Sequence, residues 1–203
     1  MFAKSLLSIS LLALSALAAP TPDTELESRQ ACADVFVFFA RGTTETPTLG
    51  TVVGPGFSSN LGAKLAARGM SLSFQGVPYP ATIGGYLAGG DEGGANTMAA
   101  SVTSAASRCP NSAIVISGYS QGAQVTHKAA ARLSSSVVNR VNAAVTFGDP
   151  DQHDAYPGVI NSRKLIFCND GDLICLGQPI VLAPHLAYGA NVGEAADFVV
   201  AHV

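Results

Sequence analysis

A serine between two glycines is the first feature of this sequence that could do chemistry. Residues 118–122 read Gly-Tyr-Ser-Gln-Gly. The β-branched run at 113–117 predicts a buried strand before the serine, and residues 121–133 predict a helix after it. A sharp strand–turn–helix exposes the serine oxygen and aims backbone N–H groups at a developing oxyanion. Ser120 is therefore the candidate nucleophile of an acyl transfer reaction.

A serine nucleophile needs a neighbouring base, and the chain offers four histidines. His127 lies two turns beyond Ser120 on the same predicted helix and cannot reach back to its oxygen. His202 lies at the C-terminus, and His153 comes only a few residues after a strand. His185 lies in a proline-containing loop after the last predicted strand, where this class of fold places its base. We predict His185, with His153 as the alternative.

The acid that orients the base should precede His185 and follow a strand. Asp170 and Asp172 both follow the predicted strand at 164–167, and composition alone does not choose between them. Three further carboxylates follow the preceding strand and remain alternatives: Asp149, Asp151 and Asp154.

The elements that must position these residues alternate between strands and helices. Apolar runs predict strands at residues 34–40, 72–77, 113–117, 143–147 and 164–167. Helical spacing predicts helices at residues 57–68, 97–107, 121–133, 135–141 and 194–201, and the glycine-rich residues 84–94 are expected to form a loop. This alternation predicts a three-layer α/β/α sandwich with a mainly parallel sheet of about five strands. Only 13 positions separate Asp172 from His185, so there is no room for a large lid.

Four cysteines, an even number, suggest two disulfides with three possible pairings. Cys168 and Cys175 are the closest pair and form the natural local bridge, which leaves Cys32 for Cys109. No cysteine or histidine spacing is typical of a zinc site, and we expect neither a metal nor a cofactor.

The N-terminus is typical of a secretory leader. Lys4 precedes an apolar run, and Ala16-Leu17-Ala18 is a small-x-small cleavage step, so residues 1–18 are predicted to be a signal peptide. Residues 19–30 are expected to form a pro-segment or disordered linker, and residues 31–203 one catalytic domain. No later segment is long and apolar enough for stable membrane insertion. The sequence therefore predicts a secreted, extracellular protein.

The charge balance argues against nucleic acid as a partner. The chain has 11 basic and 14 acidic residues, a net charge of −3, and no basic cluster. We expect a monomer whose partner is an ester substrate.

Together, these motifs resemble the fungal cutinase family of α/β-hydrolases, the group that contains cutinases and acetylxylan esterases. The similarity extends from Cys32 nearly to the C-terminus and rests on residues 32–35, 40–45, 118–122, 168–175 and 184–189. Several motifs in the right order are far more specific than any one of them.

The resemblance implies roles that the residues alone leave open. It implies that Asp172, not Asp170, is the catalytic acid, and that the disulfides are Cys32–Cys109 and Cys168–Cys175. It also implies an oxyanion hole made of the Thr43 backbone and hydroxyl and the Gln121 N–H. The chain departs from the best-known members at residues 84–94 and at Gly148-Asp149-Pro150, the latter being similar to the acetylxylan esterase branch.

The expected function is hydrolysis of carboxylic esters, with the insoluble plant polyester cutin as substrate. Apolar residues flank the catalytic loops and are candidates for a substrate rim: Ile83, Ile180, Val181, Leu182 and Leu186. Their other possible place is the core. The alternatives are an acetylxylan or other small-acyl esterase and, more remotely, a non-catalytic secreted binding protein with the same fold.

Overall fold

The computed structural model describes residues 32–203. The predicted signal peptide (1–18) and linker (19–30) lie outside these residues. Within residues 32–203, no helix is long and apolar enough to cross a membrane.

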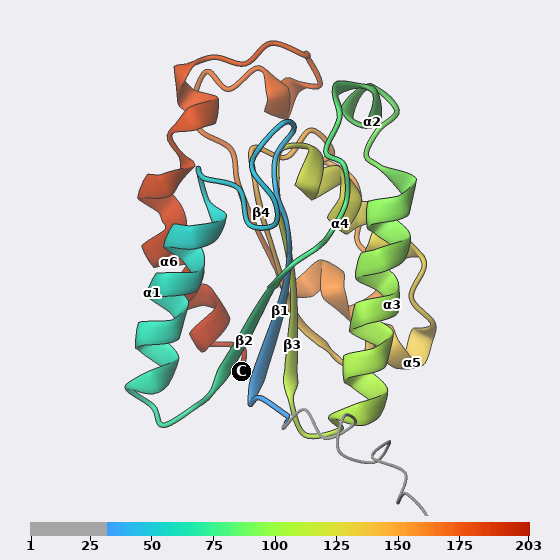
Figure 1. The fold of residues 1–203 in the computed structure, drawn as a ribbon, viewed down its shortest axis with the longest axis vertical. Coiled ribbons are helices and arrows are strands. Elements are labelled where there is room, and N and C mark those ends of the chain that lie inside the picture. Colours follow the sequence, from blue (N-terminus) through green and yellow to red (C-terminus); the bar gives the residue numbers. More distant parts are fainter. Residues whose placement is uncertain (1–31) are drawn as a thin grey trace, which may run out of the picture. The chain divides into compact units, whose positions relative to one another are not determined.

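A five-stranded parallel sheet lies at the centre of the fold (Figure 1). Its strands are β1 (Val35–Ala40), β2 (Leu72–Gly76), β3 (Ala113–Tyr119), β4 (Val141–Phe147) and β5 (Lys164–Phe167). They pair in the order β2-β1-β3-β4-β5, so β3, which leads to the candidate nucleophile, is the middle strand. Each strand coincides with a predicted one to within two residues, and the predicted α/β architecture is confirmed.

Helices cover both faces of this sheet. They are α1 (Gly54–Ala66), α2 (Ile83–Leu87), α3 (Glu92–Arg108), α4 (Gln121–Ala131), α5 (Ser135–Val138) and α6 (Val192–Val200). Among the described residues, one short 3₁₀ segment lies between β4 and β5, and three more follow β5: η2 (Gly158–Ser162), then η3 (Ile174–Leu176), η4 (Ala183–Leu186) and η5 (Tyr188–Asn191). Helices α1 and α6 lie on one side of the sheet, and α3 and α4 on the other (Figure 1).

Strand β1 shows why the sheet needs two covering layers. Every residue of the strand is buried, because alternate side chains enter opposite cores. Phe36 and Phe38 pack with the α3 and α4 side, whereas Val37 and Phe39 pack with the α1 and α6 side. The continuous apolar run in the sequence is therefore a strand buried on both faces.

The prediction of a loop at residues 84–94 was wrong. Helix α2 occupies its first part, and α3 begins at Glu92, five residues before its predicted start. Two side-chain caps offset the low helix propensity of glycine: Thr82 accepts a hydrogen bond from the Gly85 N–H, and Asp91 from the Gly94 N–H. The predicted helix at 135–141 ends at Val138, because Val141 already belongs to β4.

Both predicted disulfides are present. Cys32–Cys109 ties the first described residue to the end of α3 across 77 positions, and Cys168–Cys175 closes a loop across 7 positions. The described residues contain no free cysteine.

The two bridges should contribute differently to stability and to activity. By the loop-entropy relation, Cys32→Ser/Cys109→Ser should lower the free energy of unfolding by about 4–5 kcal/mol, and Cys168→Ser/Cys175→Ser by about 2–3 kcal/mol. The short bridge encloses Asp172, so its removal should reduce ester hydrolysis more than the loss of the long bridge does. Denaturant unfolding, with initial rates at a temperature where both variants are folded, measures the two effects. Equal specific activity in the two folded variants would contradict a role of the short bridge in the site.

Candidate active site

Ser120 lies at a sharp turn between a strand and a helix. β3 ends at Tyr119, α4 begins at Gln121, and Ser120 has φ 57° and ψ −121°. A non-glycine residue rarely adopts positive φ, and such a conformation persists only where its surroundings hold it. The Ser120 N–H donates to the Phe147 carbonyl at 2.9 Å, which ties the turn to β4. This backbone is the one expected of a nucleophile elbow.

The glycines on either side of Ser120 are required by space. A Cβ on Gly118 would lie 2.1 Å from the Gly122 carbonyl oxygen. A Cβ on Gly122 would lie 1.9 Å from the Ala40 carbonyl oxygen. Strand β3, helix α4 and the end of β1 therefore meet with no room for side chains, which is the physical reason for the Gly-x-Ser-x-Gly pattern.

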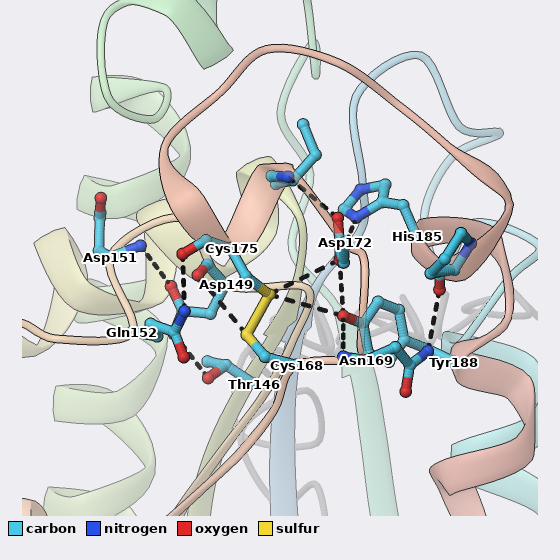
Figure 2. Close-up of a disulfide and its surroundings, with 12 residues drawn as sticks. Thr146, Asp149, Asp151, Gln152, Cys168, Asn169, Asp172, Cys175, His185 and Tyr188 are labelled. Atoms are coloured by element: carbon cyan, nitrogen blue, oxygen red, sulfur yellow. Dashed lines mark hydrogen bonds and ion pairs between the residues drawn. A yellow bond between two sulfur atoms is a disulfide. The ribbon is translucent and has the colours of Figure 1, made fainter.

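Asp172 and His185 form a buried hydrogen-bonded pair (Figure 2). The His185 ring stacks on Tyr119, the residue before Ser120. Asp172 Oδ2 lies 2.8 Å from His185 Nδ1, and each residue is only 2% exposed. A carboxylate can only accept here, so Nδ1 carries the proton and Nε2 is left as the acceptor. Of the two carboxylates that the sequence left open, Asp170 is exposed and Asp172 contacts the histidine.

Two further donors hold the Asp172 carboxylate. The Ile174 N–H donates to Oδ1 at 3.0 Å, and the Tyr188 hydroxyl donates to Oδ2 at 2.6 Å (Figure 2). Tyr188 accepts in turn from the Asn169 N–H at 3.0 Å. Burial, and next the hydrogen bond to Asp172, raise the pKa of the Tyr188 hydroxyl well above its ordinary value. Tyr188 therefore stays a proton donor over the whole neutral and mildly alkaline range.

His185 is held from two other sides. The Tyr119 hydroxyl donates to the His185 carbonyl at 2.8 Å, and the two rings stack with centroids 5.1 Å apart. Gly148, at φ 54°, lies against the imidazole, and a Cβ there would be 2.7 Å from His185 Cε1. The Asn169 side chain donates to the Pro184 carbonyl at 2.9 Å, which joins the acid loop to the histidine loop.

The loop that carries Thr43 is braced by two charged side chains. Arg41 is 2% exposed and donates to the carbonyls of Glu45, at 2.8 Å, and Tyr79, at 2.7 Å. The Glu45 carboxylate accepts from the N–H groups of Gly42, at 2.7 Å, and Val52, at 2.9 Å. These bonds fix the chain on both sides of Thr43. The Thr43 hydroxyl itself accepts a hydrogen bond from the Gln121 side-chain amide at 2.9 Å.

A cleft of about 540 Å³ joins these groups. Ser120, His185 and Thr43 all line it, although the structure shows no hydrogen bond between the Ser120 and His185 side chains. Such bonds are often long in a protein without substrate and tighten in the reacting complex.

The apolar residues predicted to form a rim are all exposed. Their exposed fractions are Ile83 62%, Ile180 47%, Val181 57%, Leu182 43% and Leu186 57%. The structure places Ile83, Val181 and Leu186 in the lining of the cleft, but not Ile180 or Leu182. Sequence reasoning missed Tyr86 and Leu87, which also line the cleft, because α2 was taken for a loop.

The other candidate histidines and acids lie elsewhere. His127 pairs with buried Asp149, with 3.0 Å between Nε2 and Oδ2, and Asp149 also accepts from the Thr146 hydroxyl at 2.7 Å. His153 and Asp154 are exposed. The His127–Asp149 pair thus joins α4 to the loop after β4. Within residues 32–203, no group of three or more histidine, cysteine or acidic residues is arranged to hold a metal ion.

Comparison with known proteins places these features in a family. The cutinase family model matches residues 31–203. The chain is 58% identical to a cutinase of Coprinopsis cinerea over 98% of both chains, and 51% identical to a cutinase of Monilinia fructicola over 97% of this chain and 95% of that one.

Two solved structures are similar as well. A Trichoderma reesei cutinase in complex with a phosphonate inhibitor matches with a TM-score of 0.78 at 39% identity, over 84% of this chain and 76% of that one. An acetyl xylan esterase matches with a TM-score of 0.66 at 27% identity, over 85% of this chain and 99% of that one.

The hydrogen bond from Tyr188 to the buried carboxylate should be measurable as stability. Tyr188→Phe removes a bond to a charged group and should lower the free energy of unfolding at pH 7 by about 1.5–3 kcal/mol. The raised pKa adds a pH dependence: Tyr188 contributes this stability below the unfolded value near 10 and loses it as the pH rises toward its folded value. The gap between wild type and Tyr188→Phe in denaturant unfolding should therefore narrow above pH 10.

Tyr156→Phe is the matched control. Tyr156 is also buried, but its hydroxyl makes no hydrogen bond to a charged group within residues 32–203. Its removal should cost about 1 kcal/mol or less at pH 7. Equal losses in the two variants would show that packing of the ring, and not the bond to Asp172, sets the Tyr188 contribution.

Proposed function

The chain belongs to the cutinase family of carboxylic ester hydrolases, and from this premise we propose that Ser120, His185 and Asp172 are its catalytic triad. The observation that carries the proposal is the buried Asp172–His185 hydrogen bond in the same cleft as a serine held at positive φ. Burying the Asp172 carboxylate and holding Ser120 at positive φ both cost free energy. Together with His185, these residues have the geometry of a nucleophile, a base and an orienting acid.

In the proposed first step, Ser120 Oγ attacks the ester carbonyl carbon while His185 Nε2 takes its proton. Asp172 holds the imidazole in the tautomer that leaves Nε2 free, and stabilises the imidazolium that forms. The imidazolium then returns the proton to the departing alkoxide, and Ser120 is left as an acyl ester. A water molecule, deprotonated by His185, cleaves this ester and restores the serine.

The oxyanion that forms in both steps needs donors. We assign this role to the Thr43 N–H and hydroxyl and to the Gln121 N–H. Gln121 is the first residue of α4, and the first N–H groups of a helix have no partner within the helix. Gln121 adjoins Gly122, and Thr43 follows two residues after Arg41, whose carbonyl lies close to Gly122. The donors are therefore in place before substrate arrives.

Cutin is the substrate that the shape of the cleft favours. The cleft is lined by exposed apolar side chains from α2 and from the loop before His185, and such a surface suits contact with long acyl chains in an insoluble polyester. The relatives named above as cutinases support the same substrate. An acetyl ester would leave most of this apolar surface in water, so acetylxylan is the second choice.

We also propose that the protein acts outside the cell. Two disulfides among the described residues are typical of proteins that fold in an oxidising compartment, and residues 1–18 have the pattern of a signal peptide. The catalytic domain would then be residues 31–203, acting as a monomer on its substrate.

The triad assignment predicts a graded pattern of losses. Ser120→Ala and His185→Ala should each lower kcat about 10⁶-fold, about as much as the double variant, because the two residues act as one unit. Asp172→Asn should cost about 10⁴-fold, because the amide favours the wrong imidazole tautomer. Asp170→Asn is the control and should keep nearly full activity, since Asp170 is exposed. Initial rates on nitrophenyl butyrate measure all five variants, and a large loss in Asp170→Asn would refute the choice of acid.

The substrate assignment predicts a split between solid and soluble esters. Ile83→Ser/Leu186→Ser should lower acid release from cutin about tenfold or more while nitrophenyl butyrate hydrolysis changes little, because buried apolar contact is worth about 25 cal/mol per Å². Leu176→Ser is the control, since Leu176 is 64% exposed but does not line the cleft. Faster release of acetate from acetylated xylan than of acids from cutin would assign the protein to small-acyl esters and leave the triad intact.

A further inference from the structure

The side chain of Gln121 makes contacts that its proposed backbone role does not need. Gln121 is fully buried at the start of α4, and its Nε2 donates to the Thr43 hydroxyl at 2.9 Å and to the Thr82 carbonyl at 2.8 Å. We propose that this side chain is a positioning residue, which holds the Thr43 hydroxyl so that its proton faces the oxyanion. The inference rests on the proposed oxyanion hole and adds to it a residue that works through Thr43.

The Thr82 carbonyl determines which end of the Gln121 amide faces Thr43. A carbonyl oxygen only accepts hydrogen bonds, so the amide atom beside it must be the nitrogen. That same nitrogen lies beside the Thr43 hydroxyl. The amide therefore donates to Thr43 and cannot accept from it.

The direction of this bond determines what the Thr43 hydroxyl can do. A hydroxyl has one proton to donate and two lone pairs that accept. Gln121 occupies a lone pair, and no acceptor within residues 32–203 takes the proton. Thr43 lines the cleft with Ser120, so the free proton is available to an oxyanion formed on the Ser120 adduct.

Packing around Gln121 keeps this arrangement in place. A Cβ on Gly85 would lie 2.6 Å from Gln121 Oε1, so a glycine in α2 makes room for the amide. The buried Oε1 itself has no hydrogen-bond partner within the described residues. Leaving Oε1 unpaired costs stability. The fold accepts this cost and keeps the two hydrogen bonds that Nε2 makes.

The same contacts connect the oxyanion loop to the helix that lines the cleft. Thr82 is the N-cap of α2, and α2 carries Ile83, Tyr86 and Leu87 of the cleft lining. One amide nitrogen thus joins the nucleophile helix, the cleft helix and the Thr43 hydroxyl.

A double-mutant cycle tests the proposal. Thr43→Val removes the hydroxyl and should lower kcat on nitrophenyl butyrate about 10²–10³-fold, the usual cost of one lost oxyanion donor. Gln121→Met fills the space without donors and should lower kcat about tenfold with KM changed less than about twofold, because the hydroxyl is still present but no longer aimed. In the Thr43→Val background, Gln121→Met should cost less than about twofold more, since the group it positions is gone.

Gln124→Met is the matched control for folding. Gln124 lies one turn along α4, is also buried, and likewise has an Oε1 without a partner within the described residues. It does not contact Thr43, so Gln124→Met should keep kcat within about twofold of wild type. Melting curves of all variants show whether a loss of rate follows a loss of structure.

Gln121→Glu separates donation from shape. The carboxyl group has nearly the size of the amide. Ionised, it only accepts and would take the Thr43 proton away from the oxyanion; protonated, it has a single O–H, which cannot serve the Thr82 carbonyl and the Thr43 hydroxyl together. We expect Gln121→Glu at pH 8 to be slower than Gln121→Met. A wild-type rate in Gln121→Glu would overturn the proposal.

The outcomes of the cycle distinguish this inference from the proposed function. If Thr43→Val is slow but Gln121→Met has the wild-type rate, the positioning role is overturned and the oxyanion hole is unaffected. The same conclusion holds if the losses of the two single variants add fully in the double variant. A wild-type rate in Thr43→Val shows that the hydroxyl is not a donor, which overturns the positioning role and leaves the proposed hole with its two backbone N–H donors. Only non-additive losses support both the hydroxyl donor and its positioning by Gln121.

Discussion

The close approach of three backbone segments at Ser120 is the constraint on which the site depends. Gly118 and Gly122 let β3, α4 and the end of β1 meet at distances where any Cβ would overlap a carbonyl oxygen. The contact between Gly122 and Ala40 matters most, because Ala40 is the last residue of β1 and the chain leads from it directly to Arg41 and Thr43. The packing that holds Ser120 at positive φ therefore also brings the Thr43 loop beside it. One steric fit thus places both the proposed nucleophile and the proposed oxyanion donors.

The histidine and its acid are positioned by different means. Asp172 lies in the loop after β5, and His185 lies in the short 3₁₀ segment η4. Hydrogen bonds and the short disulfide hold these segments in place. The Asp172 carboxylate accepts from a backbone N–H, a tyrosine hydroxyl and the imidazole, so a buried charge is fully paired. Tyr119 joins the two halves of the site, because it precedes Ser120 on β3 and its hydroxyl binds the His185 carbonyl.

The sequence predicts the scaffold well and the side-chain network poorly, for a physical reason. Strands buried on both faces leave continuous apolar runs, and a nucleophile elbow needs glycines at fixed offsets, so both features are local and readable. Helix α2 and the start of α3 were missed because their glycines argue against helices, although Thr82 is a good N-cap for α2 and Asp91 for α3. Asp170 and Asp172 are alike in the sequence, and only the fold shows that one is exposed and the other bonds His185. The contact between Gln121 and Thr43 spans 78 positions and leaves no local pattern at all.

The distribution of polar and apolar groups around the cleft is the reverse of that in an ordinary protein surface. Ser120, Asp172 and His185 are at most 6% exposed, whereas Ile83, Leu87 and Leu186 around them are at least 57% exposed. Polar groups inside are tolerable because the fold supplies their hydrogen bonds, as the three partners of Asp172 illustrate. The exposed apolar side chains gain no burial on folding, so their unfavourable hydration free energy remains. That cost is recovered only when these side chains contact an apolar surface. On the proposed substrate, the same contact would bring an ester bond to Ser120 and the proposed oxyanion donors.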